Sequence, residues 1–308
     1  MKIVSYVHEG TASIGVLDVE QQTVARLATP GGEDVSPEEM QQLLADTMDP
    51  GHGYRPRAES VPLSEVQLLA PMARPQRNVF CVGKNYVEHA KEFDSSGYDA
   101  SVGAKDNAVP DFPIVFTKPF STIIGPGAEI DPHLEVTQAL DYEAEVALVI
   151  GRPGKAIRPE DAWSHVWGMT LVNDVTARDV QLRHKQWFLG KCLDTFLPMG
   201  PWMASMDELR DLDIVLEGRV NGELRQRASM QDLIFDVPTI ISTISAGMAL
   251  QVGDVIATGT PAGVGIGMKP PRFLEPGDVV EVSATGLGQL TNTVAQATSG
   301  SRSRDDVA

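Results

Sequence analysis

The sequence is poor in cysteine and has no long apolar run. Its two cysteines, Cys81 and Cys192, cannot build a disulfide framework, and they lack the spacing of a zinc site. No apolar segment approaches the roughly 18 to 20 residues that a membrane-spanning helix needs. We therefore expect a protein that does not enter membranes, and the scarcity of cysteine favours a cytoplasmic one.

Basic residues are also scarce, which argues against a nucleic-acid surface. The chain has 42 Asp and Glu against 25 Lys and Arg, a formal net charge of −17 at pH 7. Binding to phosphate backbones needs clustered Lys and Arg, and such clusters are missing. An acidic small molecule could still bind if a divalent cation or basic residues inside a pocket neutralise it. Solubility is the simpler explanation of the charge.

Three common catalytic signatures are missing as well. The closely spaced glycines of GTPAGVGIG, residues 259–267, precede a proline-rich loop, so the helix that a dinucleotide-binding fingerprint requires is absent. There is no P-loop and no G-x-S-x-G nucleophile elbow. None of these three chemistries is therefore expected.

What the sequence does contain is a succession of short strand patterns. Residues 1–18 read as a β-hairpin rather than a signal peptide, and Ser36 is a candidate N-cap for a short helix over 36–46. From residue 66 onward apolar strands dominate, and helical patterns intrude only at 85–93 and 237–248, the second with Asp236 as its N-cap. This order favours an antiparallel or mixed β architecture over a doubly wound sheet.

Composition divides the chain into three parts. Residues 50–62, PGHGYRPRAESVP, look like a linker, so we expect a small α+β N-terminal domain over 1–68. We expect a mainly β domain over 69–298 to follow, and the small polar residues of 299–308 predict a disordered tail. The segment Phe93–Phe112 is too long and too rich in Gly, Ser and Asp for a simple connector, and we expect a lid there.

Two glutamates interrupt the apolar strand pattern LDYEAEVALVIG, residues 140–151. In a strand, side chains two residues apart point to the same face, so Glu143 and Glu145 are forced together. A buried carboxylate pair needs a compensating cation, either basic side chains or a bound metal. Asp174, where the strand of LVNDV ends, could complete three oxygen ligands for Mg²⁺ or Mn²⁺. Alternating Glu on a solvated strand face is the competing interpretation, but the flanking residues are apolar.

Other polar residues could serve the same site. His89 and Glu92 are three residues apart, which on a helix lets the carboxylate orient the imidazole as a general base for water. Lys191 follows an aromatic stretch and could complement a substrate carboxylate or an enolate. Arg178 and Gln181 would share one side of a helical turn that begins after the second carboxylate strand. Each has an ordinary alternative, as a surface pair, a lysine reaching into solvent, or helix caps.

Taken together and in this order, these motifs resemble the fumarylacetoacetate hydrolase family. The likeness runs from about residue 78 to 294, through GKNYVEHAKE, FTKP, DYEAEVALVIG, NDVTARDVQ, QWFLGKCLDTFLPMGPW, VNGELRQ, LIFDVPTIIS and GDVIATGTPAGVG. The resemblance implies a mixed β-sandwich roll with barrel-like character, usually dimeric, preceded in longer members by a small N-terminal domain. We therefore expect a homodimer. Lys84 departs from the Leu or Arg that often precedes Asn-Tyr, and the lid insertion is long; both departures concern the substrate and leave the metal site alone.

The resemblance also implies roles for individual residues. Glu143, Glu145 and Asp174 correspond to the ligands of Mg²⁺ or Mn²⁺. His89 and Glu92 correspond to a water-activating dyad, with Lys191 holding an oxyanion or carboxylate. The residues that fall where the family contacts substrate are Arg178, Gln181 and Thr260. Replacing Glu143 by Gln is expected to abolish metal binding and to leave the fold largely intact, because it relieves like-charge repulsion.

The leading hypothesis on this basis is hydrolysis of a small 2-oxo acid. The substrate would be an acylpyruvate, such as fumarylpyruvate or maleylpyruvate, cleaved to pyruvate and a carboxylic acid in the catabolism of aromatic compounds. The metal would stabilise the pyruvate enolate while His89 activates water. Two alternatives stay open on the same metal–enolate site, oxaloacetate decarboxylation and isomerisation or hydration of a 2-oxo-enoic acid. A more remote one is a non-catalytic dimer stabilised by metal.

Overall fold

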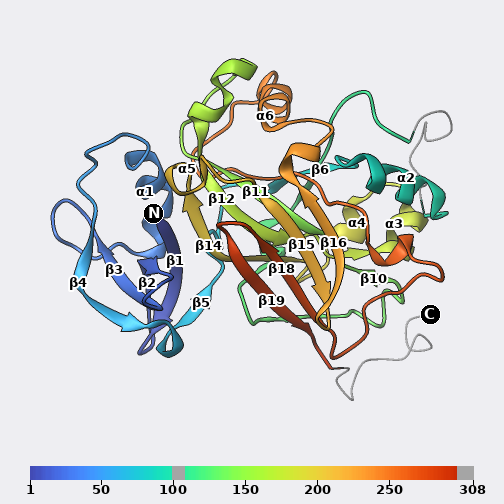
Figure 1. The fold of residues 1–308 in the computed structure, drawn as a ribbon, viewed down its shortest axis with the longest axis horizontal. Coiled ribbons are helices and arrows are strands. Elements are labelled where there is room, and N and C mark those ends of the chain that lie inside the picture. Colours follow the sequence, from blue (N-terminus) through green and yellow to red (C-terminus); the bar gives the residue numbers. More distant parts are fainter. Residues whose placement is uncertain (99–107, 297–308) are drawn as a thin grey trace.

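The computed structural model describes residues 1–98 and 108–296, which form a mainly β protein with few helices (Figure 1). The helices are α1 (Met40–Asp46), α2 (Val87–Ser95), α3 (Arg178–His184), α4 (Phe188–Lys191), α5 (Met206–Leu209) and α6 (Val237–Ser245), and the 3₁₀ turns are η1 (Pro37–Glu39), η2 (Leu63–Glu65), η3 (Phe120–Thr122), η4 (Pro159–His165), η5 (Met230–Asp232) and η6 (Gly265–Gly267). The strands are β1 (Lys2–His8), β2 (Thr11–Asp18), β3 (Thr23–Ala28), β4 (Arg55–Pro62), β5 (Gln67–Leu69), β6 (Val79–Gly83), β7 (Ile114–Lys118), β8 (Ile123–Ile124), β9 (Glu129–Ile130), β10 (Leu140–Asp141), β11 (Ala144–Ile150), β12 (Val166–Asn173), β13 (Thr176–Ala177), β14 (Leu197–Ser205), β15 (Val215–Val220), β16 (Glu223–Ser229), β17 (Val255–Ala257), β18 (Val279–Ala284) and β19 (Gly288–Val294). The predicted tail over 299–308 and residues 99–107 of the predicted lid lie outside the described residues.

The main sheet of the fold has 12 strands. Its order is β4-β3-β2-β1-β14-β12-β11-β17-β6-β7, with β5 paired to β1 and β8 paired to β14. Most neighbours are antiparallel, but β17 runs parallel to β6, and β14 runs parallel to β8. The sequence prediction of a mixed, mainly β fold is therefore confirmed, with β4 and β7 at the ends of the main sheet.

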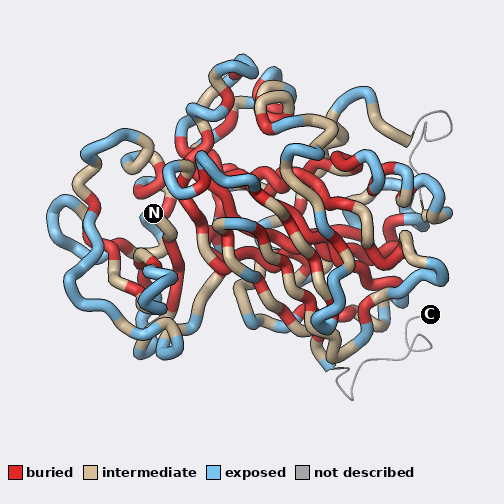
Figure 2. Tube along the Cα trace, viewed as in Figure 1, coloured by how far each residue is buried: buried red, intermediate tan, exposed pale blue. Residues whose placement is uncertain are grey.

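A second sheet of five strands, β16-β15-β18-β19-β9, packs against the main sheet. Leu216 of this sheet shares a core cluster with Val146 and Leu148 of β11, while Ala147 and Val149 of β11 belong to a separate cluster. β11 is therefore buried on both faces, which explains its nearly continuous apolar sequence. Figure 2 shows the buried residues concentrated in these central strands.

The N-terminal strands continue the main sheet. β1 and β2 form the predicted hairpin, and β1 also pairs with β14 through Lys2 and Ile3. β5 spans the predicted domain boundary at residue 68 and pairs with β1 as well. The first strands are thus joined by hydrogen bonds to the sheet that carries the site, and the boundary itself stays a prediction.

The predicted helix signals are confirmed at three places. The helix expected after Ser36 begins as the turn η1, and the Ser36 backbone N–H donates to Glu39 Oε2 at 2.9 Å before α1 follows. α2 covers most of the predicted helix at 85–93. α6 is capped by Asp236, whose Oδ1 accepts from the Thr239 N–H at 2.9 Å. The Asp236 cap of α6 thereby pairs a backbone N–H that the first turn of a helix leaves without an intrahelical partner.

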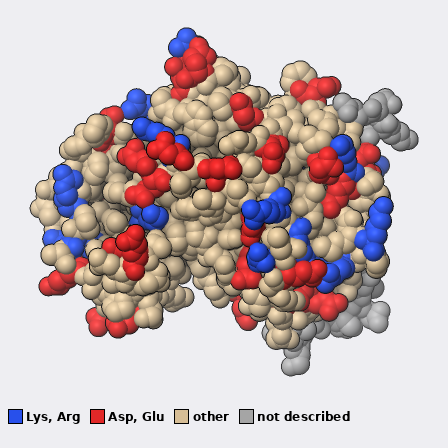
Figure 3. Space-filling view, in the orientation of Figure 1, with Lys and Arg blue, Asp and Glu red and all other residues tan. Residues whose placement is uncertain are grey.

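Charged side chains of both signs are mixed on the surface. On the face drawn in Figure 3, the described Lys and Arg residues lie among Asp and Glu rather than in one continuous basic patch. Within residues 1–98 and 108–296, no helix combines the length and the apolar character needed to cross a membrane.

Candidate active site

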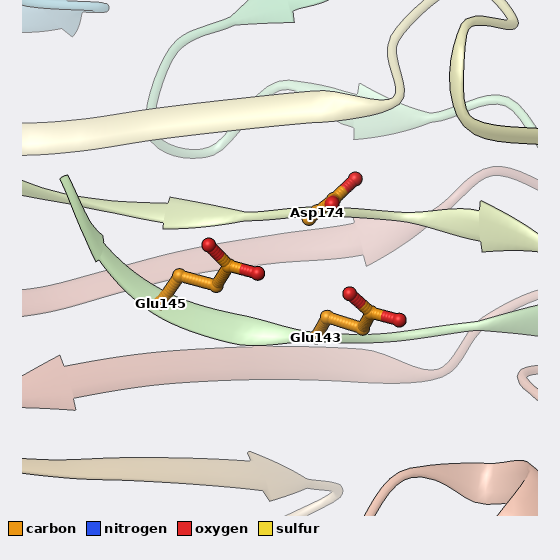
Figure 4. A group of neighbouring side chains, drawn as sticks. All are labelled: Glu143, Glu145 and Asp174. Atoms are coloured by element: carbon orange, nitrogen blue, oxygen red, sulfur yellow. The ribbon is translucent and has the colours of Figure 1, made fainter. Parts of the chain in front are cut away.

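Three carboxylates meet where β11 begins and β12 ends. Glu143 directly precedes β11, Glu145 lies within it, and Asp174 follows β12. Oxygen atoms of the three lie within 4.8 Å of one another, and all three residues are buried (Figure 4). The predicted cluster is therefore present, and it is not on a solvated strand face.

Strand register brings these residues together. β11 pairs antiparallel with β12 so that Ala144 lies opposite Asn173. The next residue, Asp174, donates its backbone N–H to the Glu143 carbonyl at 2.8 Å. The pattern LDYEAEVALVIG is not one continuous strand. The strand conformation is interrupted between β10 and β11, and Glu143 lies in that interruption.

Buried cations surround the carboxylates. The Lys191 Nζ lies 2.7 Å from Glu143 Oε2 and 2.9 Å from Asp174 Oδ2, so one ammonium bridges two carboxylates. The Lys118 Nζ donates to Asp174 Oδ1 at 2.6 Å, and Arg178 Nη1 lies 2.7 Å from Glu143 Oε1. Of the two compensations that the sequence left open, basic side chains are thus present.

The cations compensate the two glutamates unequally. Burial on its own raises the pKa of Glu143, but Lys191 and Arg178 outweigh it and lower that pKa to about 2. Burial raises the pKa of Glu145 well above its ordinary value, and the neighbouring charges of Asp174 and Glu143 raise it further. The Gly259 N–H, which donates to Glu145 Oε2 at 2.8 Å, offsets this only in part. Burial and the neighbouring carboxylates therefore favour the protonated form of Glu145.

The residues present fit a divalent metal ion. Three carboxylate groups offer the hard oxygen atoms that Mg²⁺ and Mn²⁺ prefer. The raised pKa of Glu145 marks a buried carboxylate whose charge the surrounding cations leave uncompensated, and a bound cation would balance it. Lys191 would then share Glu143 and Asp174 with the ion.

The predicted dyad forms on α2. His89 Nδ1 lies 3.4 Å from Glu92 Oε2, and His89 is buried at the same pocket as Glu143 and Glu145. Glu92 is fixed in turn, because the Gly263 N–H lies 3.1 Å from each of its carboxylate oxygens. A Cβ atom at Gly267 would overlap the Glu92 carboxylate, so a glycine is needed there for this close approach.

Arg178 opens α3 and links several site groups. Its Nε donates to Asp141 Oδ2 at 2.9 Å, and its Nη1 donates to Gln181 Oε1 at 3.3 Å. Asp141 also accepts from the Gly265 N–H at 2.7 Å. The Nη2 of Arg178 is buried and has no hydrogen-bond partner among residues 1–98 and 108–296. Because buried donors are normally paired, this nitrogen is a candidate contact for a bound ligand.

Thr260 reaches the pocket but its hydroxyl is already engaged. It donates to the Ala144 carbonyl at 2.9 Å and accepts from Gln226 Nε2 at 2.7 Å. Gln226 also accepts the Ala144 N–H at 3.0 Å. The two side chains therefore hold the start of β11 in place, and Thr260 has only one lone pair left for a substrate.

Aromatic side chains form the remaining wall of the pocket. Trp187 packs edge-on against Phe93 and Phe116, with ring centroids 6.2 and 5.4 Å apart. Gly83 leaves room for Trp187, since a Cβ there would collide with the indole ring. Phe93 belongs to α2, so the predicted lid segment begins within a helix that extends to Ser95.

Three site residues were not singled out by sequence reasoning. Lys118 belongs to the quoted motif FTKP, but a lysine at the end of an apolar strand carries no separate signal. Asp141 precedes Glu143 by two residues, so the same alternation rule could have placed it on the carboxylate face. Gln226 lies on a different sheet and has no local signal, because only the packing of the two sheets brings it to β11.

Neither cysteine is part of the chemistry. Cys81 is fully buried, and burial raises the pKa of its thiol well above the ordinary value. Burial likewise raises the pKa of Cys192 to about 11. Both residues are free thiols that stay protonated near neutral pH.

Comparison with known families matches both parts of the chain. Residues 78–295 match the family described as fumarylacetoacetate (FAA) hydrolase C-terminal. Residues 1–71 match a family described as Rv2993c-like, N-terminal.

Individual relatives and solved structures are similar over most of the chain. The oxaloacetate tautomerase YisK of Bacillus subtilis is 48% identical over 233 residues, which cover 75% of this chain and 74% of the relative. The human mitochondrial oxaloacetate tautomerase FAHD2A is 42% identical over 237 residues, 76% and 71% of the two chains. The structure of a fumarylacetoacetate hydrolase from Exiguobacterium antarcticum is 41% identical with a TM-score of 0.77, covering 96% of this chain and 99% of its own. A 2-hydroxyhepta-2,4-diene-1,7-dioate isomerase structure from Mycobacterium marinum is 31% identical with a TM-score of 0.73, covering 97% and 99%.

Proposed function

Because the chain belongs to the fumarylacetoacetate hydrolase family, as its motifs predict, we propose that it interconverts the keto and enol forms of oxaloacetate. The family consists of enzymes, and the closely similar proteins of Bacillus subtilis and human mitochondria carry the name oxaloacetate tautomerase. We assign a divalent cation, Mg²⁺ or Mn²⁺, to Glu143, Glu145 and Asp174. Acylpyruvate hydrolysis, which the sequence analysis ranked first, becomes the second candidate.

The observation that carries this proposal is the position of the His89–Glu92 pair beside the acidic cluster. Tautomerisation needs a base that removes a proton from the carbon next to the 2-oxo group, and His89 lines the pocket that the carboxylates open into. Glu92, held by the Gly263 N–H, orients the imidazole through Nδ1. A bound cation would polarise the 2-oxo oxygen as a Lewis acid.

The proton balance closes with the residues of this chain. His89 takes a proton from C3 of oxaloacetate, and the electron pair of that C–H bond forms the C2–C3 double bond while the C2 oxygen becomes negative. Lys191 faces this oxygen as an ammonium, because Asp174 and Glu143 raise its pKa by more than burial lowers it. The protonated His89 then gives this proton to the C2 oxygen, which yields the enol and restores the neutral imidazole, and the reverse sequence returns the keto form.

The same base favours hydrolysis as the second candidate. If His89 acts on water instead of on C3, that water can attack the C4 carbonyl of an acylpyruvate and release pyruvate. Decarboxylation of oxaloacetate depends less on a base, because it needs mainly a sink for the enolate electrons. The three reactions therefore differ in what they require of His89.

A substrate panel with wild-type protein and the variant His89→Ala separates the candidates. With Mg²⁺ or Mn²⁺ present, the decay of the enol absorbance of oxaloacetate measures tautomerisation, and pyruvate formation measures decarboxylation or acylpyruvate cleavage. We expect wild type to accelerate tautomerisation, and His89→Ala to lower kcat by on the order of 10²- to 10⁴-fold with KM nearly unchanged. Faster cleavage of acetylpyruvate than tautomerisation of oxaloacetate would put hydrolysis first. No turnover of any substrate would favour the non-catalytic alternative.

A further inference from the structure

A buried tyrosine lies between two carboxylates of the site. Tyr142 falls in the interruption between β10 and β11, after Asp141 and before Glu143, and it is fully buried. Its phenol donates to the Gly263 carbonyl at 2.7 Å. A buried phenol O–H usually finds a partner, and this partner belongs to the glycine-rich segment 259–267. Tyr142 therefore connects the chain around the proposed metal ligands to a segment 121 positions further on.

The residues around this tyrosine hold the same glycine-rich segment at two other places. Asp141 accepts the Gly265 N–H at 2.7 Å and the Ile266 N–H at 3.1 Å. At the other end of the segment, the Gly259 N–H donates to Glu145 Oε2 at 2.8 Å. The phenol contact lies between these two attachments, so the two stretches of chain are held side by side along their length.

Gly263 connects the phenol to the proposed base. Its N–H lies 3.1 Å from each carboxylate oxygen of Glu92, and Glu92 Oε2 lies 3.4 Å from His89 Nδ1. Gly263 has φ of 106°, in the left-handed region that favours glycine, and a Cβ there would overlap the Arg225 carbonyl. A glycine backbone restrains its own rotation little, so the direction of its N–H depends on what holds its carbonyl.

The direction of this N–H decides what Glu92 can do for His89. Because the Gly263 N–H contacts both oxygens, it fixes the plane of the Glu92 carboxylate. A carboxylate accepts hydrogen bonds, so Glu92 favours the neutral imidazole tautomer that carries its proton on Nδ1. Nε2 of His89 is then the nitrogen that can take a proton from a substrate.

We propose that Tyr142 is a positioning residue for the reaction, which acts through Gly263 and Glu92 on the tautomer of His89. The inference rests on the proposed function, because it takes His89 as the base. It extends that function to a residue that does not line the pocket. The phenol also ties the His89–Glu92 pair to the stretch of chain that carries Glu143.

The tautomer of His89 can be measured without turnover. The chain has six histidines, so ¹⁵N NMR of histidine-labelled, Mg²⁺-loaded protein gives few ring signals, and His89→Ala identifies those of His89. At a pH where the ring is neutral, we expect wild type to have a protonated Nδ1 and an unprotonated Nε2. Tyr142→Phe keeps the ring and removes the O–H, so it should move both ¹⁵N shifts toward the average of the two tautomers. Unchanged shifts overturn the proposal.

A double-mutant cycle shows whether Tyr142 acts through Glu92. With oxaloacetate, or with whichever substrate of the panel wild type turns over, Tyr142→Phe should lower kcat by about tenfold and leave KM nearly unchanged. In a Glu92→Gln background the same change should have little further effect, because residues that act through one another are not additive. Equal losses in both backgrounds would mean that the phenol has only a structural role, and they would overturn the proposal.

A matched control separates positioning from stability. Tyr54 is also buried, and its phenol donates to Asp46 Oδ2 at 2.9 Å, at the end of α1. Tyr54→Phe removes the same O–H away from the pocket, and it should change neither the His89 tautomer nor kcat. Affinity for Mg²⁺ should stay at its wild-type value in both variants.

A second substitution covers the case in which Tyr142→Phe does not fold. Replacing Tyr142 by 4-aminophenylalanine keeps a donor at the same position of the ring, but its N–H is a weaker donor than a phenol. The tautomer preference of His89 and kcat should then both lie below their wild-type values. Wild-type values of both would overturn the proposal.

The two measurements separate this inference from the function on which it rests. A protein that turns over no substrate of the panel but loses its His89 tautomer preference in Tyr142→Phe would remove the proposed reaction and keep the positioning role. A tautomerase in which Tyr142→Phe changes neither the ¹⁵N shifts nor kcat would do the reverse.

Discussion

Glu143 and Glu145 lie two residues apart and point toward the same cluster, yet their environments push their pKa values in opposite directions. Glu143 contacts both Lys191 and Arg178, and its pKa falls to about 2. Glu145 accepts a backbone N–H from Gly259, and burial raises its pKa well above the ordinary value. The two glutamates are therefore not equivalent in the metal-free protein.

The first prediction concerns the stability of the metal-free protein. An acid with a raised pKa binds its proton more tightly when folded, so Glu145 destabilises the fold as pH rises above its unfolded pKa of about 4.5, by about 1.4 kcal/mol per pH unit until the folded pKa is passed. Glu145→Gln should remove this penalty. With a chelator present, the free energy of unfolding of Glu145→Gln minus that of wild type should grow as pH rises above about 4.5 and level off once the raised pKa of Glu145 is passed. A pH-independent difference would contradict the assignment.

The second prediction revises the expectation for Glu143→Gln. The sequence analysis expected little effect on the fold, on the ground that the substitution relieves repulsion. In the structure Glu143 is held by two cations, so the variant leaves Lys191 and Arg178 without this partner and should lose roughly 3 kcal/mol of stability. The wild-type contribution of Glu143 is present above pH 4.5 and disappears as pH falls toward 2. Urea unfolding of the metal-free variant at pH 7 measures the loss of stability. A urea midpoint equal to that of wild type would contradict this prediction.

The third prediction is that metal binding releases protons. Glu145 must ionise to serve as a ligand, so affinity for Mn²⁺ should fall as pH is lowered through the raised pKa of Glu145. Calorimetric titrations in two buffers of different ionisation enthalpy give the number of protons released. Asp174→Asn should abolish binding, and Glu59→Gln, at an exposed position of β4, should bind like wild type. Proton-neutral binding at every pH would show that Glu145 is already ionised.

The fourth prediction tests how Glu92 is positioned. A methyl group at Gly267 would overlap the Glu92 carboxylate, so Gly267→Ala should displace Glu92 from His89 and lower kcat by on the order of 10²-fold. The pH dependence of kcat should also shift, because the imidazole loses its carboxylate partner. Metal affinity should be unchanged. Gly247→Ala adds the same methyl group where nothing lies within 4 Å, and it is the matched control. Full activity with an unaltered pH profile in Gly267→Ala would mean that Glu92 does not act through His89.

Several expectations stay predictions. The homodimer and the cytoplasmic location implied at the outset have no test in this structure. The lid expected over Phe93–Phe112 begins within α2, and residues 99–107 lie outside the described part of the chain. The choice between Mg²⁺ and Mn²⁺ awaits the titrations above.

Local sequence patterns determined much of this protein. Apolar alternation predicted a mainly β fold, the Asp236 cap predicted the start of α6, and three-residue spacing predicted the contact between His89 and Glu92. These features depend on backbone geometry that repeats every two or about 3.6 residues, so they can be predicted from the sequence without knowledge of the fold. The family resemblance added the metal ion expected on the three carboxylates but not the protonation state of each.

Only the tertiary structure decided which cation compensates which carboxylate. Lys118 reaches Asp174 across 56 positions of sequence, and Lys191 reaches Glu143 across 48, through strands and helices that meet only in the folded sheet. The local sequence pattern does not distinguish Glu143 from Glu145, because alternation determines which face of the strand a side chain lies on and not which residues surround it. The direction of a pKa shift depends on burial and on charges within a few ångströms, and these distances are set by packing between segments far apart in the chain.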